Sequence, residues 1–317
     1  MNASFPYNQA AEAVLMIRPK HFGFNPQTAE TNIFQVKTDA NQVSLNETAV
    51  AEFDNFVSLL HKYDVEVIVV EDQDEHKTPD SVFPNNWFTT HHDGMMVYYV
   101  MYAPVRNLEI RNDLIDILTE RNFKIKGVLD LYDEEDERPG QFLEGTGSFV
   151  FDHINKIAYA NISSRTHLEL AGKTSEFLGY VFFPFVSLVD KREVYHTNVM
   201  LTVSENFAVV CLDCLADDEK KKMLKDKLIT TGHEPVIISI EQMKKFAGNM
   251  LSVKNKKGEL ITVMSQTAFD ALDESQLEII LKYSKILPVS IPIIETVGGG
   301  SVRCMMAEIF LPKAGTT

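Results

Sequence analysis

Cys304 is the strongest candidate nucleophile in the sequence, because it follows the stretch Gly-Gly-Gly-Ser-Val-Arg at residues 298–303. Three glycines permit a tight turn and let backbone N–H groups approach a ligand closely. The neighbouring Arg303 has a fixed positive charge, which would favour the thiolate form of the cysteine. The same stretch is also typical of a plain turn before a buried strand. The motif alone therefore leaves both interpretations open.

A cysteine nucleophile needs a group that shuttles protons and an acidic partner, both from elsewhere in the fold. His196 stands in a short polar stretch before an apolar segment, where a side chain can project from the end of a sheet. Glu144 lies beside Gly145 at the junction of two expected strands. We therefore take Cys304, His196 and Glu144 as the candidate catalytic set, although each residue alone also fits a structural role.

The other cysteines and a histidine pair are weaker candidates. Cys211 and Cys214 have the C-x-x-C spacing of a redox pair or half a zinc site, but no second ligand pair follows at zinc spacing. Buried core side chains are the simpler interpretation. His91 and His92 lack a further ligand at helical spacing. We expect no metal site.

Composition narrows the class of protein. The chain has 317 residues, a net charge of −15 and 45% hydrophobic residues, which disfavours nucleic acid or acidic lipid as a partner. No basic segment followed by an apolar run begins the sequence, and no apolar stretch is long enough to cross a bilayer. Three cysteines give no disulfide framework. We expect a cytoplasmic protein without a membrane or nucleic-acid partner.

Strand-like and helix-like segments alternate along the chain, which predicts an α/β fold in one domain spanning residues 1–317. Residues 80–91 are predicted as a loop, 103–106 as a turn, and the acidic run 133–137 as a solvated loop or a lid. The strands are expected at 14–17, 65–70, 95–101, 123–131, 149–152, 157–161, 180–185, 199–203, 207–211, 235–238, 250–253 and 260–263, and the helices at 47–63, 109–121, 167–178, 217–228 and 274–285.

Several motifs together resemble one superfamily. They are Phe-Pro-Asn-Asn-Trp-Phe-Thr-Thr-His at residues 83–91, Leu-Glu-Gly-Thr-Gly-Ser at 143–148, Tyr-His-Thr-Asn-Val at 195–199, and the glycine-cysteine stretch. In this order they resemble the pentein superfamily of enzymes that modify guanidino and ureido groups, and most of all its bacterial amidinotransferase-like branch, which includes citrulline-utilisation hydrolases. The resemblance implies a five-bladed α/β-propeller of ββαβ modules around a central substrate channel, and chemistry without a cofactor.

The resemblance also implies roles for the candidate catalytic set. Cys304 would attack the central carbon of the head group of a small amino-acid substrate. His196 would protonate the leaving amine and then activate water. Glu144 would hold nitrogen atoms of the planar head group.

Further residues would bind the substrate by the same resemblance. Asp80 would take the α-ammonium group, and Phe83 would pack on the aliphatic arm in the channel loop that also contains Asn85. Arg106 and Arg165 would grip the α-carboxylate, since a guanidinium fork matches a carboxylate.

Two positions depart from the arginine deiminase pattern. Asn198 and Asn86 stand where deiminases have carboxylates. A guanidinium is a permanent cation with only donors, whereas a ureido group is neutral and offers an oxygen that an Asn amide can bind. We therefore expect citrulline as substrate, converted to ornithine, ammonia and carbon dioxide.

Other readings remain open at this point. Arginine deimination or amidino transfer would need a different head group or an acceptor amine. A binding protein of this fold without chemistry, like the ribosome-binding initiation factors, lacks the Cys/His/Glu set that this sequence has. A homo-oligomer also stays open, since no heptad or interface patch reveals the oligomeric state.

Overall fold

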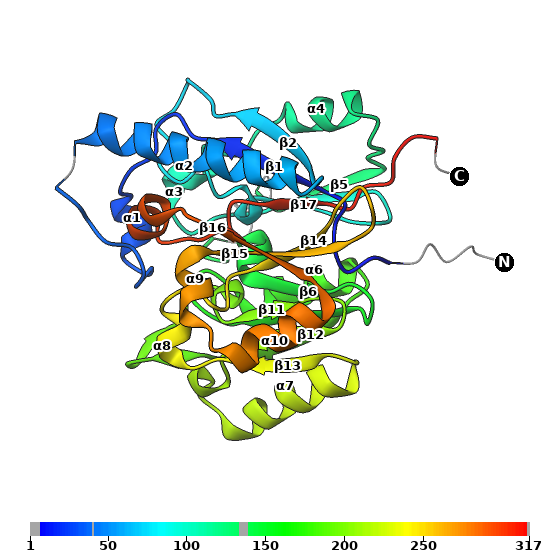
Figure 1. Cartoon of the computed structure of the whole chain (residues 1–317). Coiled ribbons are helices and arrows are strands. Elements are labelled where there is room, and N and C mark those ends of the chain that lie inside the picture. Colours follow the sequence, from blue (N-terminus) through cyan, green and yellow to red (C-terminus); the bar gives the residue numbers. More distant parts are fainter. Residues whose placement is uncertain (1–6, 40, 133–138, 316–317) are drawn as a thin grey trace.

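The structure, a computed structural model, describes residues 7–39, 41–132 and 139–315. Its strands form several small sheets instead of one continuous sheet, and helices lie on their outer sides (Figure 1). The predicted α/β class is therefore confirmed. The acidic run 133–137, for which a lid was considered, falls outside the described residues.

Five three-stranded sheets in the described part of the chain share one pairing pattern. In each, the middle strand is antiparallel to one neighbour and parallel to the other. The sheets are, with the middle strand second, β17 (Ala307–Ile309), β1 (Ala13–Arg18) and β2 (Glu66–Glu71); β3 (Phe88–Thr90), β4 (Met95–Tyr98) and β5 (Gly127–Asp130); β6 (Phe149–Asp152), β7 (Ile157–Asn161) and β8 (Val181–Phe185); β11 (Leu201–Val203), β12 (Phe207–Val210) and β13 (Glu234–Ile237); and β14 (Leu251–Lys254), β15 (Leu260–Ser265) and β16 (Lys285–Val289).

A helix follows each middle strand, because the parallel third strand can be reached only by a crossover. These crossover helices are α2 (Gln42–Lys62), α4 (Leu114–Glu120), α6 (Leu168–Phe177), α7 (Asp218–Thr230), and the pair α9 (Gln266–Ala271) and α10 (Glu274–Tyr283). The shorter elements are α1 (Pro26–Ala29), η1 (Pro84–Asn86), α3 (Pro104–Asn107), α5 (Gly145–Ser148), η3 (Thr197–Val199), η4 (Leu212–Cys214), α8 (Ile240–Met243), η5 (Ile294–Gly298) and the hairpin of β9 (Leu188–Val189) with β10 (Arg192–Glu193).

Helix α2 shows how the sequence builds a crossover. The side chain of Asn41 caps its first turn by accepting from the N–H of Val43 at 2.8 Å. Apolar residues then recur at helical spacing and are buried, namely Leu45, Ala49, Phe53, Phe56 and Leu60. This stripe packs against β1 and β2, and α2 lies along the upper edge in Figure 1.

The first and last strands of the described chain pair with each other. Strand β17 pairs antiparallel with β1, so that Leu15 lies opposite Ala307. The first sheet therefore combines strands from both ends of the sequence. This pairing places the turn that carries Cys304, just before β17, next to the N-terminal part of the chain.

Most predicted elements are confirmed, and several local predictions are wrong. Strands β6 and β7 have the predicted bounds. The predicted loop at 80–91 contains η1 and β3, the predicted turn at 103–106 is the one-turn helix α3, and the helix expected from residue 109 begins only at Leu114. Strands β16 and β17 were not predicted.

A short turn precedes the antiparallel outer strand of each of the five three-stranded sheets, and each turn carries a polar residue of interest. The turns before β3, β6 and β11 lie in contact with one another through η1, α5 and η3. The sheets thus bring together turns that are far apart in the sequence. The five residues, in the order of β3, β6, β11, β14 and β17, are Asn86, Glu144, His196, Asn249 and Cys304.

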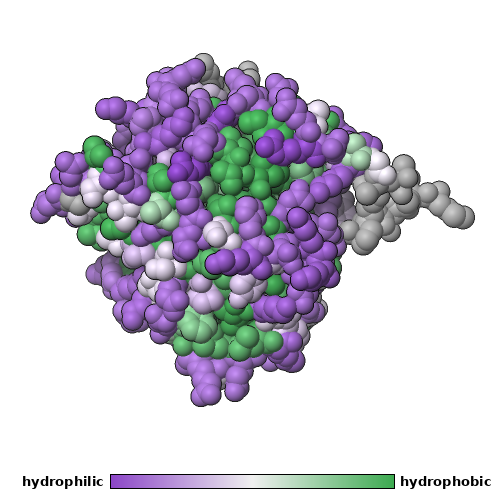
Figure 2. Space-filling model, turned by 45° about the horizontal axis from the view of Figure 1, so that its top comes forward, coloured by the Kyte–Doolittle hydropathy of each residue, from purple (hydrophilic) through white to green (hydrophobic). Residues whose placement is uncertain are grey.

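The surface is largely hydrophilic in the view of Figure 2, with hydrophobic residues gathered in patches near the upper centre and toward the lower edge. Among the described residues, no helix is long and apolar enough to cross a membrane. Cys211 and Cys214 are buried in the core, as predicted.

Candidate active site

One small cavity brings most of the predicted site residues together. Its volume is about 20 Å³, enough for a single water molecule. Cys304, His196 and the three glycines at 298–300 share this cavity with residues from four other parts of the chain. The lining residues are Thr28, Asn32, Asp80, Phe83, Asn86, Arg106, Arg165, Tyr195, His196, Gly298, Gly299, Gly300 and Cys304.

His196 and Glu144 are in close contact in the site. Nε2 of His196 lies 2.6 Å from Oε2 of Glu144, and both side chains are buried. Burial lowers the pKa of His196 to about 4, although the Glu144 carboxylate opposes this shift. The imidazole is therefore neutral near pH 7 and can accept a proton.

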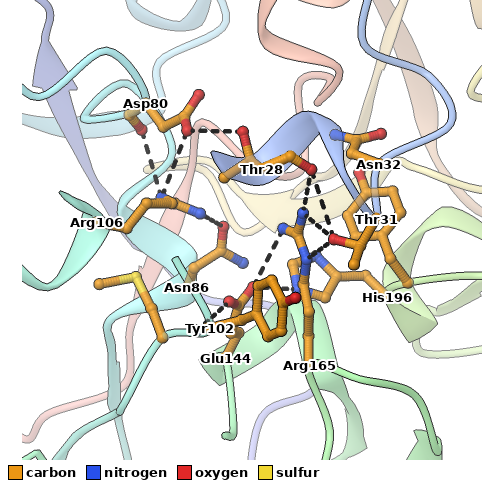
Figure 3. A network of polar contacts seen from close by, with 12 residues as sticks. Thr28, Thr31, Asn32, Asp80, Asn86, Tyr102, Arg106, Glu144, Arg165 and His196 are labelled. Atoms are coloured by element: carbon orange, nitrogen blue, oxygen red, sulfur yellow. Dashed lines mark hydrogen bonds and ion pairs between the residues drawn. The ribbon is translucent and has the colours of Figure 1, made fainter. Parts of the chain in front are cut away.

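Glu144 is held by three further groups. Its Oε1 accepts from the N–H of Tyr102 at 2.9 Å, and Nη1 of Arg165 lies 3.5 Å from Oε2 (Figure 3). Its own N–H donates to Oγ of Ser148 at 2.8 Å. Burial alone would raise the pKa of the carboxyl, but Arg165 and the bond with His196 outweigh it and lower the pKa to about 2. Glu144 is therefore a fixed negative charge in the site.

The sulfur of Cys304 faces two amides. Nδ2 of Asn198 lies 3.7 Å from Sγ, and Nδ2 of Asn249 lies 3.4 Å from it. The Arg303 guanidinium, which was expected to favour the thiolate, instead donates to the carbonyl of Met306 at 3.0 Å and to Glu308 at 2.8 Å. The long Arg303 side chain thus pairs with Glu308, because a largely buried carboxylate is costly without a cationic partner.

Asp80 is buried beneath the helix α1 segment. Its Oδ2 accepts from Nδ2 of Asn25 at 2.6 Å and from Oγ1 of Thr28 at 3.3 Å, and lies 4.0 Å from Nε of Arg106. Its Oδ1 has no hydrogen-bond partner. Burial raises the pKa of Asp80, and Arg106 opposes that rise. One acceptor oxygen of Asp80 is thus free for a ligand.

Arg106 is already engaged by the protein. Its Nε and Nη2 form a fork on Glu109, at 3.0 and 2.8 Å, and Nη1 donates to Oδ1 of Asn86 at 2.7 Å. Nη2 also donates to the carbonyl of Phe83 at 3.1 Å. The fork that was predicted to grip a substrate carboxylate therefore holds Glu109 in this state. Glu109 was not singled out in the sequence.

Asn86 is oriented by that bond from Arg106. Because Oδ1 accepts the guanidinium, Nδ2 points the other way, and it is buried without a partner. A Cβ added to Gly147 would lie 2.5 Å from this Nδ2 and 2.5 Å from Cε1 of His196, so the amide and the imidazole flank the same glycine. Asn85 lies behind this layer and donates to Oγ1 of Thr146 at 3.2 Å.

Arg165 ties the segment around α1 to the catalytic groups. Its Nη2 donates to the carbonyl of Thr28 at 2.8 Å and to Oγ1 of Thr31 at 2.7 Å, while Nη1 faces Glu144 (Figure 3). The guanidinium carbon lies 4.8 Å from the ring centre of Tyr195. Arg165 therefore spans the cavity, and no substrate carboxylate can use its fork until these contacts change.

The glycines at 298–300 allow neighbouring groups to pack closely against the backbone. A Cβ on Gly298 or Gly300 would lie 2.8 or 2.9 Å from the Phe83 ring. The carbonyl of Gly299 accepts from the hydroxyl of Tyr195 at 2.9 Å and from Nδ2 of Asn32 at 3.0 Å. The absence of side chains thus lets the Phe83 ring and the turn before Cys304 form one wall of the cavity.

The structure separates the predicted site residues into two groups. Asp80, Phe83, Asn86, Arg106, Arg165, His196 and Cys304 line the cavity, whereas Asn85, Glu144 and Asn198 are buried behind it. The sequence did not reveal Asn249, Tyr195 or the residues 25–32 over the cavity. A local signal for Asn249 in the sequence is its position directly before the strand predicted at 250–253. Among the described residues, no group of three or more His, Cys, Asp or Glu could hold a metal.

Comparison with known proteins assigns the chain to a family. The model of the family "N,N dimethylarginine dimethylhydrolase, eukaryotic" matches residues 18–311. No curated protein sequence matches the chain. Solved structures share the fold at low sequence identity.

Two of these structures are the arginine dihydrolase ArgZ of the ornithine-ammonia cycle in cyanobacteria. Unliganded ArgZ has a TM-score of 0.71 and 16% identity over 96% of this chain, which spans only 41% of that protein. The N-terminal domain of ArgZ, a cysteine-to-serine variant bound to substrate, has a TM-score of 0.69 and 16% identity over 94% of this chain and 99% of that domain.

A third structure is the dimethylarginine hydrolase (DDAH) of Pseudomonas aeruginosa, a cysteine-to-serine variant in complex with citrulline. Its TM-score is 0.64, with 16% identity over 95% of this chain and 100% of that protein. These likenesses show a shared fold, and the family match covers nearly the whole chain. The chain belongs to the N,N dimethylarginine dimethylhydrolase family, within the pentein superfamily of guanidino-modifying enzymes.

Proposed function

We propose that this protein hydrolyses citrulline to ornithine, ammonia and carbon dioxide through a covalent intermediate on Cys304. One observation carries the choice of substrate. The buried amide of Asn86 presents an unpartnered Nδ2 beside His196, while its Oδ1 is fixed by Arg106. An N–H donor at this place can bind the oxygen of a ureido group, whereas a guanidinium carries only donors of its own.

The amino-acid end of citrulline fits the other side of the cavity. The free Oδ1 of Asp80 can accept from an α-ammonium group, and Arg165 can turn its fork to the α-carboxylate. Phe83 offers an aromatic face for the aliphatic arm. Since the cavity holds only about 20 Å³, residues 25–32 must move before an amino acid can enter.

The chemistry needs one proton shuttle. His196 takes the proton of the Cys304 thiol, and the sulfur attacks the ureido carbon. The C–N bond to the δ-nitrogen breaks, and that nitrogen takes the proton from His196 and leaves as ornithine. A carbamoyl group then remains on the sulfur.

Water completes the reaction. His196 removes a proton from the water as it attacks the carbamoyl carbon, and the sulfur leaves and recovers a proton. The product carbamate decomposes to ammonia and carbon dioxide. Glu144, which is buried behind the cavity, keeps His196 in place throughout.

We further infer that the five three-stranded sheets stand as blades of one propeller in a single domain around this cavity. The common pairing pattern and the meeting of the turns before the first strands support this arrangement. In such a fold the five turns face a shared axis, which explains why residues more than 100 positions apart line one cavity.

A second candidate is hydrolysis of arginine or a methylated arginine, which the family match favours. The negative charges of Asp80 and Glu144 could accompany a cationic head group. Against it, Asn86 and Asn198 place amides, not carboxylates, near the reacting centre. The two candidates differ in the head group that becomes attached to the sulfur.

The test compares citrulline, arginine and dimethylarginine with the purified protein. We expect ornithine and ammonia from citrulline, and a carbamoyl mass on Cys304 in protein quenched during turnover. Cys304→Ala is the control and should form neither. Citrulline accumulating from arginine or dimethylarginine, with no turnover of citrulline itself, would show that the second candidate is right.

A further inference from the structure

Asn249 is not among the residues that line the cavity, but its side-chain amide contacts the sulfur of Cys304. Its Nδ2 lies 3.4 Å and its Oδ1 3.8 Å from Sγ, and Nδ2 also donates to the carbonyl of Asn198 at 2.9 Å. The Asn249 side chain is fully buried. Nδ2 of Asn198 adds a second amide at 3.7 Å from the same sulfur. Two neutral N–H₂ groups thus face one thiol.

We infer that Asn249 is a further catalytic residue, which together with Asn198 stabilises the Cys304 thiolate before the substrate is attacked. An N–H donor to an anion is a strong hydrogen bond in a buried site. The catalytic role of Asn249 rests on the proposed function. The hydrogen bonds from the two amides to the sulfur do not depend on which substrate binds.

The charges around the sulfur explain why the amides are needed. The Arg303 guanidinium is occupied by Glu308 and Met306, and burial keeps His196 neutral near pH 7. The other charged groups that share the site are Glu144 with Arg165, and Asp80 and Glu109 with Arg106, so each cation already faces a carboxylate. The neutral ureido head group of the proposed substrate would bring no positive charge to the sulfur either. Stabilisation of the anion therefore falls to dipolar donors.

The turn that carries Asn249 is firmly fixed. The hydroxyl of Thr202 donates to the carbonyls of Gly248 and Met250, at 2.8 and 3.0 Å, on both sides of Asn249. The N–H of Asn249 donates to the carbonyl of Phe246 at 2.8 Å. A Cβ on Gly248 would lie 2.4 Å from the carbonyl of Val199, so this turn packs directly on the turn that carries His196. The amide is thus preorganised and does not need to move to meet the sulfur.

The position of Asn249 within its sheet supports the same conclusion. It precedes β14 as Asn86 precedes β3, Glu144 precedes β6, and Cys304 precedes β17. The turn before β11 supplies both His196 and Asn198. Each of the five three-stranded sheets therefore contributes a polar group from the turn before its antiparallel outer strand. Asn249 is the contribution of the sheet that the sequence motifs leave out.

The test measures how fast iodoacetamide alkylates Cys304 at a series of pH values, without substrate. Signal from Cys211 and Cys214 is subtracted with Cys304→Ala. In Asn249→Asp, which keeps the shape but replaces the donor by a carboxylate, we expect the pH midpoint of alkylation to rise by about one unit or more. Turnover should fall with it. An unchanged midpoint in folded Asn249→Asp overturns the inference.

Two further measurements keep the test decisive. Asn112→Asp is the matched control, since Asn112 is exposed, and its midpoint should equal that of the wild type. If Asn249→Asp fails to fold, Asn249→Ser is measured instead, with the same expected direction. Because no substrate is used, failure to hydrolyse citrulline would leave this result independent.

Discussion

His196 and Glu144, 52 positions apart in the sequence, meet at 2.6 Å between Nε2 and Oε2 in a fully buried contact. The contact joins the turns before β6 and β11 and fixes which ring nitrogen faces the carboxylate. Burial disfavours the imidazolium more than Glu144 favours it, so the resting imidazole is a proton acceptor and becomes a donor once it has taken a proton. The proposed mechanism uses both states in turn.

Removal of the Glu144 charge should therefore impair turnover. Glu144→Gln keeps an acceptor for the N–H of Tyr102 but leaves Arg165 without its carboxylate partner and His196 without a countercharge. We expect kcat/KM for citrulline to fall at least about 100-fold, in the range seen when an electrostatic partner of a reacting group is lost. The matched control is Glu169→Gln on the exposed face of α6, where Glu169 pairs with Lys173. A loss of less than about tenfold in Glu144→Gln would contradict the assigned role.

The substrate preference should follow the amide of Asn86. Asn86→Asp preserves the acceptor for Arg106 but replaces the free N–H₂ by an oxygen, which repels a ureido oxygen and attracts a guanidinium. We expect the ratio of kcat/KM for citrulline over arginine to fall by about tenfold or more. Measurement of both substrates with both proteins gives the ratio directly. An unchanged ratio would rule out charge matching at this position.

Local sequence patterns predicted the elements that depend on local burial. Strands β6 and β7 were predicted with their bounds, because apolar runs flanked by turn residues report burial directly. Strand β17 is only three residues long and exists because β1, almost 300 positions away, pairs with it. No local pattern encodes such a partner, so β17 was missed.

The site residues were likewise predicted where a local motif marks them and missed where only the fold brings them together. Residue types and motifs pointed to Cys304 and His196, which the structure places on one cavity. The direction of a long side chain was not readable, and Arg303 therefore turned out to pair with Glu308. Asn249 was missed because a single Asn before a strand is typical of any loop. Asn249 comes next to the sulfur of Cys304 only in the folded structure, where the five turns lie together.

Gly147 should be needed for the geometry of the site. A methyl group there would lie 2.5 Å from Nδ2 of Asn86 and 2.5 Å from Cε1 of His196, so one of the two must shift. We expect Gly147→Ala to lower kcat at least about 100-fold, because displacements near 1 Å can cost that much. Gly172→Ala in α6 is the control, since its Cβ would meet only Phe182 at 3.5 Å and alanine favours a helix. Full activity of folded Gly147→Ala would show that the site tolerates the shift.

The stability of the fold should decrease in acid because of three histidines near β4 and β6, of which His91 and His153 are buried and His92 is half-buried. Burial lowers the pKa of His91 to about 3 and that of His92 to about 4, and it lowers the pKa of His153 well below its usual range. The unfolded chain binds protons at these positions below about pH 6.5, whereas the folded chain does not. The stabilisation is therefore complete above about pH 6.5 and is lost progressively as the pH falls toward the folded-state values. Urea unfolding at about pH 7 and pH 5 should show a lower free energy of unfolding at pH 5, with a slope reduced by up to about 1.4 kcal/mol per pH unit in His153→Phe. The exposed His61→Gln should keep the wild-type slope, and equal slopes in all three proteins would mean that His153 does not contribute to the acid sensitivity.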